Sequence, residues 1–168
     1  MAENEKLEGI VDITKKPPVL RIATAAGSIR LKKSTIEAIN AGQIKKGDVL
    51  TTARLAAILA VKDTPWIIPM CHTIPITGME VKFDLEQERV GVAVTVTSVG
   101  MTGVEMEALT GVTVALLNIW DMVKYLEKDE TGNYPETEMG NIRVLEKRKF
   151  QSKMECLREK EAEAPSGN

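Results

Sequence analysis

The longest segment with a regular hydrophobic pattern in this chain of 168 residues runs from Val104 to Val123. Apolar residues there fall on nearly every side of a helix with 3.6 residues per turn, which predicts a helix buried on most of its surface. Thr102 and Glu105, three positions apart, match the capping pattern of a helix start. We therefore expect the rest of the fold to pack around this helix.

A stripe of polar and small residues interrupts the apolar surface of the predicted helix. Glycine inside a helix costs about 1 kcal/mol relative to alanine, so Gly111 suggests that a second backbone approaches closely. The stripe predicts either a tight contact with another helix or a functional site. At about 100° per residue it contains Glu107, Gly111, Val114, Asn118, Asp121 and Tyr125.

Asp121 and Lys124 are one turn apart and can meet on the helix surface. Such a pair is most often solvated, but the apolar residues around it make a functional pair about equally expected, with the carboxylate fixing the position and pKa of the ammonium. Glu107 lies about 21 Å from Asp121 along a straight helix, too far for one small site. Two antiparallel copies would bring these side chains together, which predicts a two-fold dimer with a shared site.

Shorter patterns predict the other elements. Alternation of apolar and polar residues predicts strands at 19–25, 29–31 (after a turn at Gly27-Ser28), 79–85, 90–99 and 142–145. Capping patterns predict a helix at 34–40, with Ser34 and Glu37 as the capping pair, and a helix at 49–61, with Asp48 as N-cap and Thr64-Pro65 as its end.

The coarse order is strand, helix, two strands, helix, strand. This order is the split βαβ plan of an α+β, ferredoxin-like fold, in which helices pack on one face of an antiparallel sheet. Residues 66–78 contain two prolines and His72, so we expect an irregular packed loop, where functional groups often lie. We expect a charged lead-in at 1–10, one domain at 11–150 and a charged tail at 151–168.

Composition narrows the function classes. A net charge of −2 argues against general nucleic-acid binding. Two distant cysteines, Cys71 and Cys156, are no disulfide framework and indicate a reducing compartment. The N-terminus lacks the apolar core of a signal peptide, and no uninterrupted apolar run approaches the length of about 18 residues that would span a membrane. We therefore expect a soluble cytoplasmic protein.

The candidate chemistry is proton transfer and anion binding. Phosphate-loop, dinucleotide and G-x-S-x-G motifs are absent, and one histidine beside one cysteine cannot supply a usual zinc ligand set. A lone histidine is more often structural, Lys46 beside Gly47 is more often solvated, and Cys71 can be a small core residue, so these alternatives stay open. The candidate groups are Lys46, His72, Glu105, Glu107, Asp121, Lys124 and Lys147.

Several motifs, in order along the chain, resemble the MoaC family, the cyclic pyranopterin monophosphate synthases of molybdenum cofactor biosynthesis. The resemblance spans about residues 11–147, while the loop at 129–140 looks longer than usual in the family and the chain beyond Phe150 is unmatched. The motifs are Lys46-Gly47-Asp48 with Thr52-Ala53-Arg54, Ile68-Pro69-Met70-Cys71-His72 with 74–77, Thr102 to Leu109, and Asp121-Met122-Val123-Lys124.

The resemblance implies a hexamer, built as a trimer of dimers, with active sites at a subunit interface and no cofactor or metal. The implied reaction converts 3',8-cyclo-7,8-dihydro-GTP to cyclic pyranopterin monophosphate with release of pyrophosphate. The alternative is a non-catalytic oligomeric protein that binds a nucleotide or pterin. By position, the resemblance implies catalytic roles for Asp121, Lys124 and Lys46, and substrate binding by Met70, Cys71, His72, Met106, Glu107, Glu105, Lys147 and Arg21.

Overall fold

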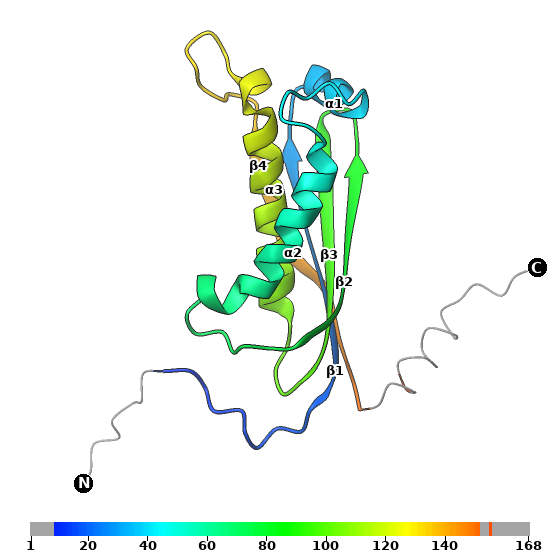
Figure 1. The fold of residues 1–168 in the computed structure, drawn as a ribbon, viewed down its shortest axis with the longest axis vertical. Helices are drawn as coiled ribbons and strands as arrows, with labels where there is room; N and C mark the ends of the chain where they lie inside the picture. The colour runs from blue at the N-terminus through cyan, green and yellow to red at the C-terminus, as the bar shows by residue number, and fades with distance from the viewer. Residues whose placement is uncertain (1–8, 152–154, 156–168) are drawn as a thin grey trace, which may run out of the picture.

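The structure is a computed structural model that describes residues 9–151 and 155. Two long helices lie side by side on one face of a four-stranded sheet (Figure 1). The strand order is β2-β3-β1-β4, and every neighbouring pair is antiparallel, which confirms the ferredoxin-like α+β prediction. The elements are β1 (Val19–Arg30), α1 (Lys33–Asn40), α2 (Val49–Ile67), β2 (Ile76–Leu85), β3 (Arg89–Gly100), α3 (Glu105–Glu127) and β4 (Glu138–Phe150).

The core lies between the sheet and the two long helices. Alternate valines of β3, from Val90 to Val96, are at most 2% exposed, because one face of the strand points at the helices. Small residues in β1 let α3 pack directly on the sheet. A Cβ added at Gly27 would lie 2.9 Å from Val112 Cγ1 of α3. The central position of α3 thus follows from an apolar helix that packs on a strand of small residues.

The contact between α2 and α3 explains the glycine in the middle of α3. A Cβ added at Gly111 would lie 2.8 Å from Val61 Cγ2 and 3.6 Å from the carbonyl oxygen of Ala57, both in α2. This confirms the close helix contact predicted from the polar stripe. The stripe therefore faces α2 at Gly111.

Two strand predictions were too short. The turn expected at Gly27-Ser28 is absent, because β1 continues to Arg30 and pairs with β3 along its whole length. The pairing of β1 with β4 instead shifts register between Thr24 and Ala25 and between Ala26 and Ser28. β4 covers 138–150 rather than 142–145, because its charged residues at the sheet edge show no hydrophobic alternation.

The helix ends test the capping predictions. Asp48 is the N-cap of α2 as predicted, and its Oδ1 accepts the Thr51 N–H at 2.9 Å. The Thr102/Glu105 prediction is wrong, because α3 starts after Val104 with no side-chain cap. The same holds for Ser34 and Glu37, because α1 begins at Lys33 and also has no side-chain cap.

The structure confirms the predicted irregular segments in part. α2 continues past Pro65 to Ile67, because a proline in the last turn removes only one helix hydrogen bond. The irregular loop is therefore 68–75 rather than 66–78, and β2 takes up its last residues. No helix or strand occurs in the polar segment 129–137, as expected. Residues 1–8 of the expected lead-in, most of the expected tail and Cys156 lie outside the described residues.

By length and composition, α3 is also the one helix in the described part of the chain that could cross a membrane. Over its most apolar window, 56% of the residues are buried inside the fold. Core helices of folded domains commonly have this length and hydropathy, and α3 packs against α2, β1, β3 and β4. Its apolar character is accounted for by these contacts.

Candidate active site

Lys46, Asp121 and Lys124 form one charged cluster near the C-terminal end of α3. Lys46 Nζ lies 2.6 Å from Asp121 Oδ2, and Lys124 Nζ lies 2.7 Å from Asp121 Oδ1. Lys46 Nζ also donates to the main-chain oxygen of Asp121 at 2.8 Å. Each carboxylate oxygen thus meets one ammonium, and the three side chains are 44% to 51% exposed. The predicted Asp121–Lys124 pair is confirmed, and Lys46 joins it from the loop before α2.

The two cations change the protonation of the cluster. Hydrogen bonds from Lys124 first, and then from Lys46, lower the pKa of Asp121 to about 2. In return, the hydrogen bond that Lys124 donates to Asp121 raises the pKa of Lys124. The carboxylate therefore stays ionised at any ordinary pH, and Lys124 stays a proton donor. The cluster can hold an anion or deliver a proton to one.

Gly47 gives the loop its shape at the residue after Lys46. Its φ is +100°, a conformation that L side chains rarely adopt, and its N–H donates to the Ile44 carbonyl at 3.0 Å. Gly47→Ala is expected to lower the free energy of unfolding by about 1 kcal/mol or more and to reduce any turnover that uses Lys46. Urea unfolding measures the first effect. Gly9→Ala is the matched control, because an added Cβ there meets nothing within 4 Å and φ is not positive.

A second group of charges surrounds the start of α3. Lys147 Nζ of β4 lies 3.0 Å from Glu105 Oε1. Arg21 of β1 donates from Nε to the Gly100 carbonyl at 2.9 Å and from Nη2 to the Met101 carbonyl at 3.1 Å. Partial burial opposes ionisation of Glu105, but its own N–H together with Lys147 and Arg21 lowers its pKa. Glu105 therefore acts as a fixed anion that holds cations in place.

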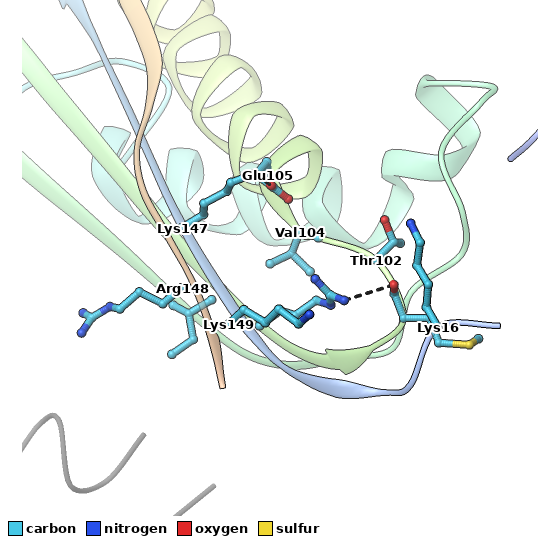
Figure 2. A pocket seen from close by; sticks show the side chains of 11 residues that line it. Lys16, Thr102, Val104, Glu105, Lys147, Arg148 and Lys149 are labelled. Carbon is cyan, nitrogen blue, oxygen red and sulfur yellow. Dashed lines mark hydrogen bonds and ion pairs between the residues drawn. The ribbon is translucent and has the colours of Figure 1, made fainter. Parts of the chain in front are cut away.

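These residues line a pocket of about 350 Å³, shown in Figure 2. The register places Lys149 opposite Arg21 and Lys147 opposite Ala23, so alternate residues of β4 point to the pocket side. In Figure 2 the side chain of Arg148 extends to the other side of β4. Sequence analysis missed Lys16, which lies just before β1, and Lys149, which reaches the pocket through the pairing of β4 with β1. With Arg21 and Lys147 they make the pocket strongly basic.

Glu107 is a buried carboxyl group close to this region. It is 2% exposed, and no described residue makes a hydrogen bond to its Oε2. Burial raises the pKa of Glu107, and the charge of Glu105 adds to the rise, while the hydrogen bond from its own N–H lowers the pKa by less. Burial also raises the pKa of the half-buried Cys71 thiol, and the charge of Glu107 adds to that rise. Glu107 can therefore exist as a neutral acid that donates a hydrogen bond.

The raised pKa of Glu107 predicts a pH effect on stability. A carboxyl group whose pKa is higher in the folded than in the unfolded protein opposes folding at a pH where it is ionised in both. This penalty is lost as the pH falls through the folded-state pKa toward the unfolded-state pKa. Glu107→Gln is expected to raise the free energy of unfolding by about 1 kcal/mol near neutral pH and to have less effect in acid. Urea titrations at several pH values measure the difference, and an equal effect at every pH would contradict the argument.

Of the remaining predicted residues, Met70, Cys71 and His72 lie on the loop between α2 and β2, and Met106 lies in the first turn of α3. His72 Nε2 lies 2.7 Å from the Val11 carbonyl oxygen, so its ring holds the segment before β1. Met70 and Met106 are exposed. Among residues 9–151 and 155, no three His, Cys, Asp or Glu side chains come together as a metal site. Six of the predicted residues thus form two charged sets rather than one: Lys46, Asp121 and Lys124 in the first set, and Arg21, Glu105 and Lys147 in the second.

The two sets lie at opposite ends of α3. Sixteen residues separate Glu105 from Asp121, which corresponds to about 24 Å along the helix. The first set, Lys46, Asp121 and Lys124, therefore cannot contact the same small molecule as the pocket of the second set within one chain. The sequence analysis likewise expected the two ends of the helix, represented by Glu107 and Asp121, to lie too far apart for one small site.

Comparisons with known proteins assign this chain to a family. The model of the MoaC family matches residues 10–149. A protein of Methanosarcina acetivorans, described as a probable cyclic pyranopterin monophosphate synthase, is 61% identical over 140 residues, which are 83% of this chain and 89% of that protein. A protein of Methanothermobacter thermautotrophicus, described as a probable cyclic pyranopterin monophosphate synthase accessory protein, is 55% identical over 148 residues, or 88% and 93% of the two chains.

Among solved structures, a mutant of the ferredoxin protease FusC in complex with Arabidopsis ferredoxin is 19% identical, covering 62% of this chain and 10% of that chain. Its TM-score of 0.31 is too low to support an argument. The family assignment therefore comes from the family model, which covers most of the chain, and from the close sequence relatives. The chain belongs to the MoaC family.

Proposed function

We propose that this protein is a cyclic pyranopterin monophosphate synthase, a lyase that converts 3',8-cyclo-7,8-dihydro-GTP to cyclic pyranopterin monophosphate and releases pyrophosphate. The observation that carries the proposal is the cluster in which Asp121 holds Lys46 and Lys124 on its two carboxylate oxygens. A cyclic phosphate forms when a substrate hydroxyl attacks phosphorus and the bond to pyrophosphate breaks. That step needs cations around the phosphates and groups that move protons.

The two sets of residues have different tasks in this proposal. Lys124, with its raised pKa, acts as a proton donor or anion clamp, and Asp121 orients both lysines. The basic pocket with Arg21, Lys147 and Lys149 suits the phosphate groups, since guanidinium and ammonium groups bind phosphate oxygens strongly. Met70, Cys71, His72, Met106 and Glu107 complete the substrate contacts.

The separation of the two sets supports an active site shared between subunits. A second, antiparallel copy would bring the start of its α3 toward the end of the first. The outer helix surface is suited to such a contact, because Leu55 and Leu59 of α2 and Leu117 of α3 are 56% to 60% exposed. We propose that the working unit is this dimer, that three dimers form a hexamer, and that the enzyme is cytoplasmic.

The proposed function is tested by incubating the purified protein with the cyclised GTP derivative and measuring pyrophosphate and pterin product. Equal amounts of both products, absent without protein, are the expected result. Tight binding of the compound without any product would instead indicate a non-catalytic nucleotide- or pterin-binding protein. Sedimentation velocity in the same buffer tests the assembly, and a monomer that turns over substrate would contradict the shared site.

A further inference from the structure

Tyr125 follows Asp121 by one turn of α3, and both residues contact the loop that carries Lys46. Asp121 binds the Lys46 side chain. The Tyr125 hydroxyl oxygen accepts the backbone N–H of Lys45 at 3.1 Å, and the Lys45 ammonium lies 5.3 Å from the centroid of the Tyr125 ring. α3 therefore holds this loop at two points, one through the Lys46 side chain and one through the backbone N–H of the preceding residue, Lys45.

Other contacts also shape the loop, and Ile44 anchors its start in the hydrophobic core. Ile44 is buried, the Gly47 N–H donates to the Ile44 carbonyl, and Asp48 caps α2. Lys46 has a long flexible side chain that is 44% exposed, so its ion pair alone restrains it weakly. A catalytic group displaced by about 1 Å can lose about 100-fold in rate. The contact with Tyr125 adds a restraint on the backbone at Lys45, between the buried Ile44 and the ion-paired Lys46.

We propose that Tyr125 is a positioning residue, whose hydroxyl fixes the backbone of Lys45, the residue before Lys46, and so holds the Lys46 ammonium against the Asp121 carboxylate. The proposal deepens the proposed function and rests on it wherever turnover is measured. The placement of Lys46 can also be measured without turnover, because Lys46 and Lys124 are the two cations that face Asp121.

Tyr125→Phe tests the hydroxyl directly, since it removes the acceptor of the Lys45 N–H and keeps the ring that packs against the core. The expected result is a fall in kcat of about fivefold, the effect of one neutral hydrogen bond, with little change in KM. The pKa of Asp121, followed by carboxyl NMR, is expected to rise from about 2 toward its ordinary value, because Lys46 is then held less closely. A purely structural role of the ring would not move this pKa.

Lys45→Met is the matched control, because it removes the ammonium over the ring and leaves the backbone N–H that binds Tyr125. We expect its kcat and Asp121 pKa to stay close to wild type. Unchanged kcat in Tyr125→Phe overturns the proposal, as does a loss that appears only in Lys45→Met. If the wild-type protein has no turnover, the proposed function fails, and the Asp121 pKa in Tyr125→Phe then decides the positioning role alone.

Discussion

Asp121→Asn is expected to lower kcat by at least about 100-fold, the usual contribution of a positioned acid–base group, with a much smaller change in KM. Asparagine keeps the shape of the side chain but carries no charge, so it cannot bind two ammonium groups through two oxygens as Asp121 does. Lys124 also loses the partner that raises its pKa. Steady-state measurement of pyrophosphate release, with the substrate varied, separates kcat from KM.

Stability should hardly change in Asp121→Asn, because ion pairs as exposed as these contribute little to folding. Glu80→Gln is the matched control, since Glu80 forms an exposed ion pair with Lys82 at 3.1 Å on β2, outside both sets of site residues. Its turnover and melting temperature should equal those of the wild type. Full turnover in Asp121→Asn would remove the cluster from the mechanism.

Local patterns in the sequence predicted those parts of the site that depend on one element. The spacing of Asp121 and Lys124 places both on one face of any helix, and the structure joins them at 2.7 Å. Asp48 before an apolar helix is another local signal, and it caps α2 as predicted. The capping pattern of Thr102 and Glu105 failed because α3 starts after Val104, and the Glu105 carboxylate binds Lys147 on a distant strand instead.

Contacts between distant segments could not be predicted from local patterns. Lys46 reaches Asp121 because its loop docks on the end of α3, and although Lys46 was a candidate group, local patterns did not predict its contact with Asp121. Lys149 lies opposite Arg21 because of the register of β4 on β1, which contains two shifts. Such a register depends on tertiary packing, and the charged edge strand lacks the alternation of apolar and polar residues from which a register could be predicted.

The dimeric active site predicts that two inactive variants restore each other's activity. Asp121→Asn damages the set at the end of α3, and Lys147→Ala damages the basic pocket about 24 Å away. If each active site takes one set from each of two subunits, random mixing of equal amounts should leave about a quarter of the sites with both sets intact. We therefore expect co-refolded variants to recover about 25% of wild-type turnover.

Asp121→Asn mixed with Lys124→Ala is the matched control, because both changes lie in the same set and no site in the mixture can contain that set intact. This mixture should stay as inactive as its components. If turnover recovers in the Asp121/Lys147 mixture but not in the control, the active site must cross a subunit boundary, since neither chain alone carries both sets intact. If both mixtures stay inactive while the Lys147→Ala chain still assembles with its partner, all catalytic groups come from one chain, and the 24 Å separation must instead be bridged by a rearrangement of α3.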